Sequence, residues 1–117
     1  MKITIQFPND CFTATLTDQS AARALLAKLP LNLKVSDFAS AEKIAYLPQK
    51  LDVSDAPAGT GATVGDLAYY APWGNLALFY KKAAYASGLV HLGRIDGDLG
   101  RLAQLTDGSV TIEQVRD

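Results

Sequence analysis

Two strand-like runs that end in aromatic residues, joined by Pro72-Trp73-Gly74, constrain the fold of this chain more than any other feature. The first strand is expected at residues 67–71 and the second at residues 76–80. Aromatic residues favour strands, whereas Pro and Gly favour turns. Neighbouring side chains on a strand point to opposite faces, so only one of Tyr69 and Tyr70 can enter a core. The pattern therefore predicts two strands that meet at a turn containing Trp73.

Five further segments have the pattern of strands. Their apolar residues alternate with polar ones or are enriched in residue types that favour strands. The segments cover residues 2–7, 11–16, 31–38, 89–95 and 109–115. The turn signal Pro8-Asn9-Asp10 lies between the first two, which predicts a hairpin.

Two segments have the composition of helices. Residues 21–29 are rich in Ala and Leu, follow the candidate N-caps Thr17 and Asp18, and stop at Pro30. Residues 98–105 predict a short helix with Asp98 at its start, where a negative charge is favoured. The middle of the chain is less regular, and residues 55–62 read as a surface loop rich in Gly and Pro.

The chain length and this order of elements predict one domain over residues 1–117. Hydrophobic residues make up 49% and charged residues 20%, which is close to the average for globular chains. We expect a mainly β fold: a closed, mostly antiparallel barrel with one helix of moderate length and one short helix capping its ends.

Charge and hydropathy exclude several classes of partner. The chain has 11 basic and 12 acidic residues, and its longest basic run is Lys81-Lys82, so we expect no nucleic-acid partner. The N-terminal residues lack the apolar segment of a signal peptide, and no apolar run reaches the roughly 20 residues of a membrane span. We therefore expect a cytoplasmic protein without a membrane partner.

The sequence predicts neither a metal site nor a cofactor. Cys11 is the only cysteine, which excludes an intrachain disulfide and a cysteine-based metal cluster, and we expect it to be a small buried side chain. His91 is the only histidine, with no other ligand at a suitable offset, and we expect a structural role. Gly59-Thr60-Gly61 lacks the remaining residues of a nucleotide-binding loop.

Four aromatic residues are candidates for a ligand-binding groove: Tyr46, Tyr70, Trp73 and Tyr80. Tyrosine and tryptophan combine an apolar face with a polar tip, which suits a ligand site or a protein contact, although packing of the barrel is the alternative. Trp73 lies in a turn and is the residue that core packing explains least.

Two charged residues complete the candidate site. Glu42 can place a carboxylate beside the strand with Tyr70, although two adjacent charges such as Glu42-Lys43 usually lie in a solvated turn. Alternation places Arg94 on the same face as Leu92. There it could bind an anionic ligand, but a pair with a carboxylate such as Glu42 is the favoured interpretation.

The order and spacing of several short motifs resemble those of the small prokaryotic cyclophilin-like proteins. The motifs are Glu42-Lys43-Ile44, Pro48, Gly65-Asp66-x-x-Tyr69-Tyr70-x-Pro72-Trp73-x-x-Leu76-Ala77-x-Phe79-Tyr80 and Leu92-Gly93-Arg94-Ile95. The resemblance covers nearly the whole chain and implies a cyclophilin-like barrel. The function of these small proteins is mostly unassigned.

The resemblance supports a prediction of the fold more strongly than a prediction of the activity. Cyclophilins are prolyl isomerases with a Phe-His-Arg motif, which this sequence lacks. Matching residues 90–95 onto the isomerases places Leu89 at the position of their active-site His. We expect a non-catalytic module that binds a small molecule or a peptide through Glu42, Tyr46, Tyr70, Trp73, Tyr80 and Arg94. The alternatives are a divergent prolyl isomerase and an aromatic surface used for homo-oligomerisation.

Overall fold

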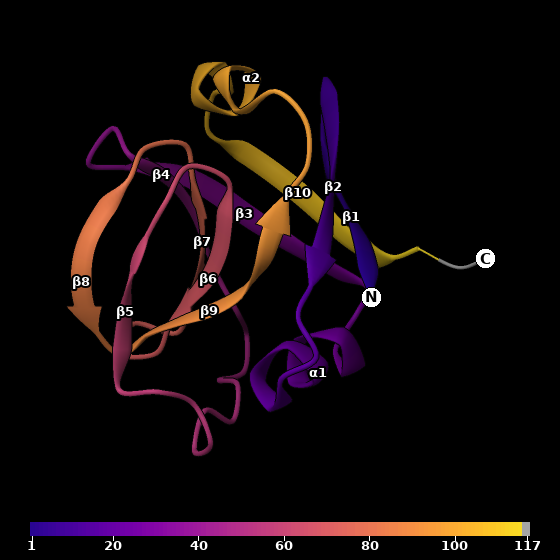
Figure 1. Ribbon diagram of the computed structural model, residues 1–117. Helices are drawn as coiled ribbons and strands as arrows, with labels where there is room; N and C mark the ends of the chain where they lie inside the picture. Colours follow the sequence, from indigo (N-terminus) through magenta and orange to yellow (C-terminus); the bar gives the residue numbers. More distant parts are fainter. Residues whose placement is uncertain (116–117) are drawn as a thin grey trace.

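The computed structural model describes residues 1–115, and its main feature is a closed barrel of eight antiparallel strands (Figure 1). The order around the barrel is β1-β10-β3-β4-β7-β6-β9-β2. These strands are β1 (Lys2–Phe7), β2 (Asp10–Leu16), β3 (Leu31–Phe38), β4 (Glu42–Tyr46), β6 (Asp66–Tyr70), β7 (Asn75–Phe79), β9 (Leu89–Ile95) and β10 (Gly108–Gln114). The prediction of a mainly β, closed and mostly antiparallel barrel is confirmed.

The barrel interior is filled by the apolar residues that alternate along each strand. Ile3 and Ile5 on β1, and Leu76 and Leu78 on β7, are almost completely buried in one continuous core. Tyr69 belongs to this core, whereas its neighbour Tyr70 points outward, as the alternation predicts. The faces expected from the sequence for β6 and β7 are therefore correct.

Two helices lie at opposite ends of the barrel in Figure 1: α1 (Ser20–Ala27) and α2 (Leu99–Gln104) are the helices within residues 1–115. Each contributes buried apolar side chains to the core. Asp98 is the N-cap of α2 and accepts a 2.8 Å hydrogen bond from the Gly100 N–H, as predicted. The predicted caps of α1 are wrong because Gln19 occupies the N-cap position without a side-chain bond, and Asp18 instead pairs with Arg23.

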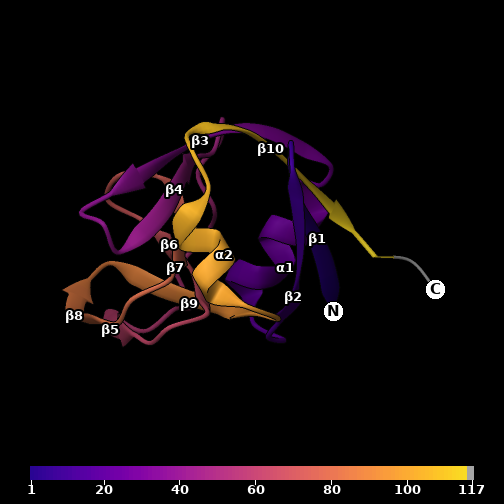
Figure 2. The same ribbon diagram turned by 90° about the horizontal axis from the view of Figure 1, so that it is seen from above.

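A second, smaller sheet lies outside the barrel. It is a ribbon of β5 (Gly59–Ala62) and β8 (Ala83–Ser87), which run side by side in both views (Figures 1 and 2). Between the ribbon and the outer face of the barrel lies a second apolar cluster. It contains Ile44, Ala62, Ala68, Ala77, Phe79 and Leu89. The molecule therefore has two apolar layers, of which the outer one is built largely from alanine.

Three strands were not predicted from the sequence. Residues 59–62 were interpreted as a surface loop and residues 83–87 as a connection, yet they pair as β5 and β8. Both consist mainly of Gly, Ala and Thr, which carry little strand signal, so their pairing depends on the barrel surface beneath them. The third strand, β4, was missed because it is buried on both faces. Ile44 on its outward face lies beneath the ribbon, and Ala45 on its inward face lies in the core, so apolar and polar residues do not alternate.

Two sequence predictions about orientation are wrong. A register irregularity between β6 and β9 inserts one extra residue near Leu92, so Ile95 joins Leu92 in the core and Arg94 points to solvent. Cys11 is exposed rather than buried, because its neighbour Phe12 takes the inward position on β2. Within residues 1–115, neither helix has the length and hydropathy needed to cross a membrane.

Candidate functional site

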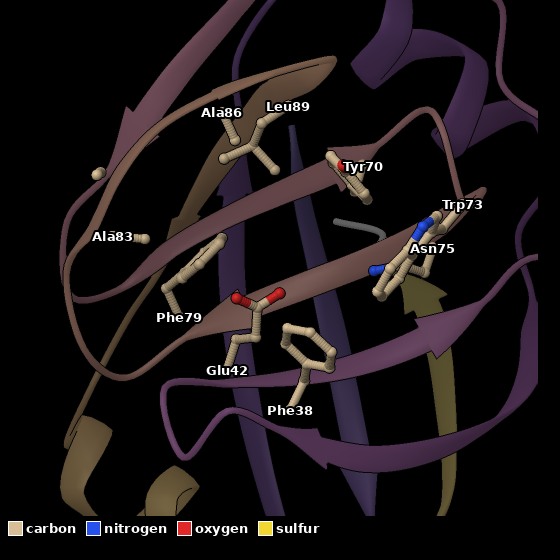
Figure 3. A pocket seen from close by; sticks show the side chains of 10 residues that line it. Phe38, Glu42, Tyr70, Trp73, Asn75, Phe79, Ala83, Ala86 and Leu89 are labelled. Carbon is tan, nitrogen blue, oxygen red and sulfur yellow. The ribbon is translucent and has the colours of Figure 1, made fainter.

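A mostly apolar hollow lies between the outer face of the barrel and the β5–β8 ribbon (Figure 3). Its volume is about 270 Å³. The lining side chains come from β3, β4, β6, β7, β8, β9 and the turn at residues 71–74. They are Phe38, Glu42, Tyr70, Trp73, Asn75, Phe79, Ala83, Ala84, Ala86 and Leu89. We call this hollow the ribbon pocket.

The pocket exists because one wall is made of small residues. Ala83 and Ala86 of the ribbon pack against the cluster that contains the larger Phe79 and Leu89 of the barrel, and Ala84 also lines the pocket. A methyl group fills much less space than a leucine or phenylalanine side chain, so open space remains between the two layers at this point. Figure 3 shows Ala83 and Ala86 at one side of the pocket, away from Trp73.

Three aromatic rings line the side of the pocket away from the ribbon. Trp73 packs edge-to-face against Phe38 and against Tyr70, with 5.4 Å between ring centroids in each pair. Such contacts are favourable and fix the orientation of the rings. Trp73 nevertheless remains 49% exposed, so its ring is held in place while much of its surface stays available.

Glu42 supplies the carboxylate of the pocket. The β3–β4 hairpin places it directly opposite Phe38, and the tight turn between them holds Ala39 and Ser40 at positive φ. Glu42 is partly buried, and this burial, followed by the negative charge of nearby Asp37, raises the pKa of its carboxyl group. The carboxylate would therefore gain from a positively charged or hydrogen-bond-donating neighbour.

Asn75 is a buried polar group at the other end of the pocket. It lies on the same face of β7 as Phe79, four residues away, and is only 1% exposed. Its Nδ2 donates a 3.0 Å hydrogen bond to the carbonyl oxygen of Leu76. Its Oδ1 has no hydrogen-bond partner among the described residues. Since buried polar atoms are normally paired, this acceptor stands out.

Of the six residues predicted from sequence, the structure brings three together in the pocket: Glu42, Tyr70 and Trp73. Tyr46 lies opposite Asn75 on β4 but is 54% exposed and does not line the pocket. Tyr80 and Arg94 lie elsewhere, each within its own polar cluster.

Tyr80 faces the barrel interior instead of the pocket. Its hydroxyl group donates a short hydrogen bond to Asp37, whose carboxylate also lies 3.2 Å from Nζ of the buried Lys43. Burial, followed by the hydrogen bond to Asp37, raises the pKa of Tyr80 to about 12. This cluster closes the end of the barrel beneath α2.

Arg94 pairs with Asp66, not with Glu42. Its Nη1 lies 2.7 Å from Asp66 Oδ1, and Nε2 of His91 lies 3.4 Å from the same oxygen. The other oxygen of Asp66 accepts a 2.8 Å hydrogen bond from the Thr63 N–H and so caps the turn before β6. Arg94 therefore forms the predicted kind of pair with a different carboxylate.

Several pocket residues were not singled out in the sequence. Phe38 and Phe79 belong to correctly predicted strands, and Asn75 directly precedes the predicted start of one, but nothing in the sequence shows that the outer face of those strands is covered. The ribbon alanines carry no chemical signal at all. Leu89, which the match to the isomerases placed at the position of their His, does line the pocket.

The barrel is that of a cyclophilin-like domain, and the chain belongs to the cyclophilin-like family, whose model matches residues 5–113. A search of curated proteins finds no match. The chain is also similar to the solution structure of a hypothetical protein from Archaeoglobus fulgidus, with a TM-score of 0.72 and 20% identity. That alignment covers 98% of this chain and 95% of the archaeal one. At this identity the likeness shows the fold alone.

Within the described part of the chain, no three His, Cys, Asp or Glu side chains lie close enough together to hold a metal ion.

Proposed function

We propose that this chain is a binding module that holds a small molecule in the ribbon pocket. The observation that supports this most directly is an apolar hollow of about 270 Å³ with four aromatic side chains and few polar groups. Ligand sites are typically concave and mostly apolar, with a small number of placed polar groups. The volume suits a small organic molecule, since pockets for drug-sized ligands begin at roughly 300 Å³.

Trp73 is the residue on which binding should depend most. Its ring is oriented by Phe38 and Tyr70, yet half of it faces solvent. A ligand that covers this ring removes apolar surface from water without having to order the side chain first. The pocket is therefore preorganised, and binding should cost little side-chain entropy at Trp73.

Ligand-observed NMR with a mixture of small aromatic amines, acids and alcohols tests this proposal. We expect several fragments to bind the unmodified protein, and Trp73→Ala to weaken them at least about tenfold. Tyr85→Ala is the matched control, because Tyr85 is a 65% exposed aromatic residue outside the pocket. An unchanged affinity of Trp73→Ala for the fragments would contradict the proposal.

The proposed role is non-catalytic, and this part has its own test. Leu89 cannot donate a proton or a hydrogen bond, and among the described lining residues no arginine is present to polarise a prolyl amide. We expect no faster cis–trans exchange of an X-Pro peptide when the protein is added at high concentration. Acceleration that Trp73→Ala abolishes would instead establish the divergent isomerase.

Self-association is the remaining alternative, because Phe38 and Trp73 are 40% and 49% exposed and lie side by side. Sedimentation velocity across a concentration series separates it from ligand binding. A Trp73-dependent dimer would cover the pocket and replace the small molecule as its occupant.

A further inference from the structure

The β5–β8 ribbon forms one wall of the ribbon pocket, yet little packing holds it in place. In the described part of the chain, its two strands pair with each other and with no strand of the barrel. The side chains that it packs against the barrel are those of Ala62, Ala83 and Ala86. A methyl group makes few van der Waals contacts, so this wall needs other attachments to keep its distance from the barrel.

One attachment is made by the side chain of Arg94 on β9. Its Nη1 donates a 3.1 Å hydrogen bond to Oγ1 of Thr63, and its Nη2 donates a 2.9 Å hydrogen bond to the carbonyl oxygen of Val64. Nη1 also lies 2.7 Å from Oδ1 of Asp66, the first residue of β6. The planar fork of an arginine side chain can serve several acceptors at once. The passage from β5 to β6 is therefore tied to a strand of the barrel.

Asp66 makes this attachment firmer. Its carboxylate is largely buried, and Oδ2 accepts a 2.8 Å hydrogen bond from the Thr63 N–H. Thr63 is thus held twice, through its hydroxyl group by Arg94 and through its N–H by Asp66. Without Arg94, Asp66 keeps the Thr63 N–H and the more distant Nε2 of His91, at 3.4 Å. Loss of Arg94 should therefore loosen this passage without leaving the buried carboxylate alone.

The attachment is connected to the pocket through two neighbouring residues. Thr63 directly follows Ala62, the last residue of β5, which is buried against the barrel in the outer apolar cluster. Ala62 pairs with Ala83 of β8, and Ala83 lines the ribbon pocket (Figure 3). A shift of Thr63 would therefore move Ala62 and, through the strand pair, the alanine wall. Coupling of this kind needs an unbroken chain of contacts, which these residues supply.

Resting on the proposed function, we infer that Arg94 is a positioning residue of the ribbon pocket: it sets the distance between the alanine wall and the barrel without touching the occupant. With the wall held close, a molecule of one ring contacts both layers. With the wall released, the small molecule loses the contacts on one side, whereas a larger molecule regains them. Arg94 thereby contributes to the size selectivity of a pocket that it does not line.

Two alcohols that differ by one fused ring test the inference: benzyl alcohol and 2-naphthalenemethanol. Trp73 is the only tryptophan, so its single indole N–H resonance reports binding at the pocket in a titration followed by NMR. In Arg94→Gln we expect benzyl alcohol to bind about fivefold more weakly and 2-naphthalenemethanol to change by less than about twofold. The ratio of the two affinities is the readout, because partial unfolding would weaken both probes by the same factor.

Amide hydrogen exchange gives a second readout that needs no ligand. A two-stranded ribbon is marginally stable by itself, so its release from the barrel should also open its own hydrogen bonds. We expect the amides of β5 and β8 to exchange about tenfold faster in Arg94→Gln, with those of β1 and β2 unchanged.

Arg101→Gln is the matched control for both readouts. Arg101 lies on α2, outside the ribbon and the pocket, and its Nε is 3.2 Å from Asp10 Oδ2. The side chains of Arg101 and Arg94 are similarly exposed, at 48% and 55%. The control therefore removes the same charge and an ion pair of the same kind, and we expect it to change neither the affinity ratio nor the exchange of the ribbon amides.

Thr63→Val is the milder variant, for the case that Arg94→Gln does not fold. It removes the hydroxyl group that accepts from Arg94 and leaves the pair of Arg94 with Asp66 and the net charge unchanged. We expect a smaller change in both readouts, in the same direction as in Arg94→Gln.

The outcomes distinguish the inference from the proposed function. Equal weakening of the two probes in the folded variants, or unchanged exchange of their ribbon amides, overturns the inference while the pocket remains a binding site. If neither these probes nor the wider fragment mixture move the Trp73 resonance of the unmodified protein, the proposed function fails, and the role of Arg94 in selectivity fails with it. The exchange experiment alone then shows whether Arg94 holds the ribbon.

Discussion

Nζ of Lys43 donates a 2.6 Å hydrogen bond to the main-chain carbonyl oxygen of Leu105, the residue that ends α2. The two residues are 62 positions apart in the chain. Lys43 is only 3% exposed, so this carbonyl group and the nearby Asp37 carboxylate take the place of water as partners of its ammonium group. The bond attaches a short helix to β4 and so closes one end of the barrel.

Replacing this lysine should destabilise the fold. Lys43→Met keeps the length of the side chain but leaves the Leu105 carbonyl group without its donor and Asp37 without its cation. We expect the free energy of unfolding to fall by about 2–3 kcal/mol in urea denaturation. Lys34→Met, at an exposed position of β3, should change it by less than about 0.5 kcal/mol. Equal effects of the two variants would contradict the role of Lys43.

Tyr80 should titrate well above the ordinary pKa of a tyrosine side chain. Burial and the hydrogen bond to Asp37 raise its pKa from 10.0 to about 12. Between these values the folded protein binds more protons than the unfolded chain, so stability should fall as the pH rises through this interval. Phenolate absorbance should show a component near pH 12 that disappears in Tyr80→Phe and persists in Tyr46→Phe. Its persistence in Tyr80→Phe would show that Tyr80 is not the group responsible.

Glu42 should make the fold less stable when it ionises. Burial first, and the charge of Asp37 second, raise the pKa of its carboxyl group above 4.5 in the folded protein. From 4.5 up to the folded pKa, the folded state holds more protons, so stability falls as the pH rises through this window. Glu42→Gln should therefore be more stable than the unmodified protein at pH 7, with the gain vanishing near pH 4.

The corresponding measurement is the urea midpoint at both pH values, with Glu113→Gln as control. The control variant should show the same pH dependence as the unmodified protein, because Glu113 is exposed. A Glu42→Gln variant that is less stable at pH 7 would mean that the carboxylate makes a stabilising contact which its burial and charge environment do not reveal.

Gly93 should be indispensable for closing the barrel. A Cβ atom at this position would lie 2.2 Å from the carbonyl oxygen of Thr15 and 2.9 Å from the Cα atom of Leu16, both on β2. Backbone cannot yield as a flexible side chain can, so Gly93→Ala should separate β2 from β9 and cost about 2–4 kcal/mol. The control is Gly108→Ala, where a Cβ atom meets nothing within 4 Å. Thermal unfolding should shift strongly in the first variant and little in the second.

The barrel was predictable because its strands obey local rules. Ile3 and Ile5 alternate with polar residues, and Asp98 precedes a short helical run, so each pattern signals its element without reference to the rest of the chain. Arg94 shows where such rules fail. One extra residue in the pairing of β6 with β9 reverses the face on which it lies, and only the partner strand determines where that residue is inserted.

The candidate site was predictable only in part for a related reason. Trp73 is conspicuous because a large aromatic residue in a turn has no obvious core to join, and Glu42 because it is a carboxylate. Asn75 gave no such signal, since its significance depends on burial beneath the ribbon and on an unpaired acceptor. The ribbon is held in place by tertiary contacts of small residues, and no local sequence pattern predicts these contacts.

The two-layer construction separates the residues that keep the chain folded from those that shape the pocket. Leu76 and Leu78 belong to the inner core, whereas Ala83 and Ala86 sit in the outer ribbon. An enlargement of either alanine would narrow the hollow without entering the barrel interior. A few changes in the outer wall can thus reshape the hollow while the folding of the barrel is left intact.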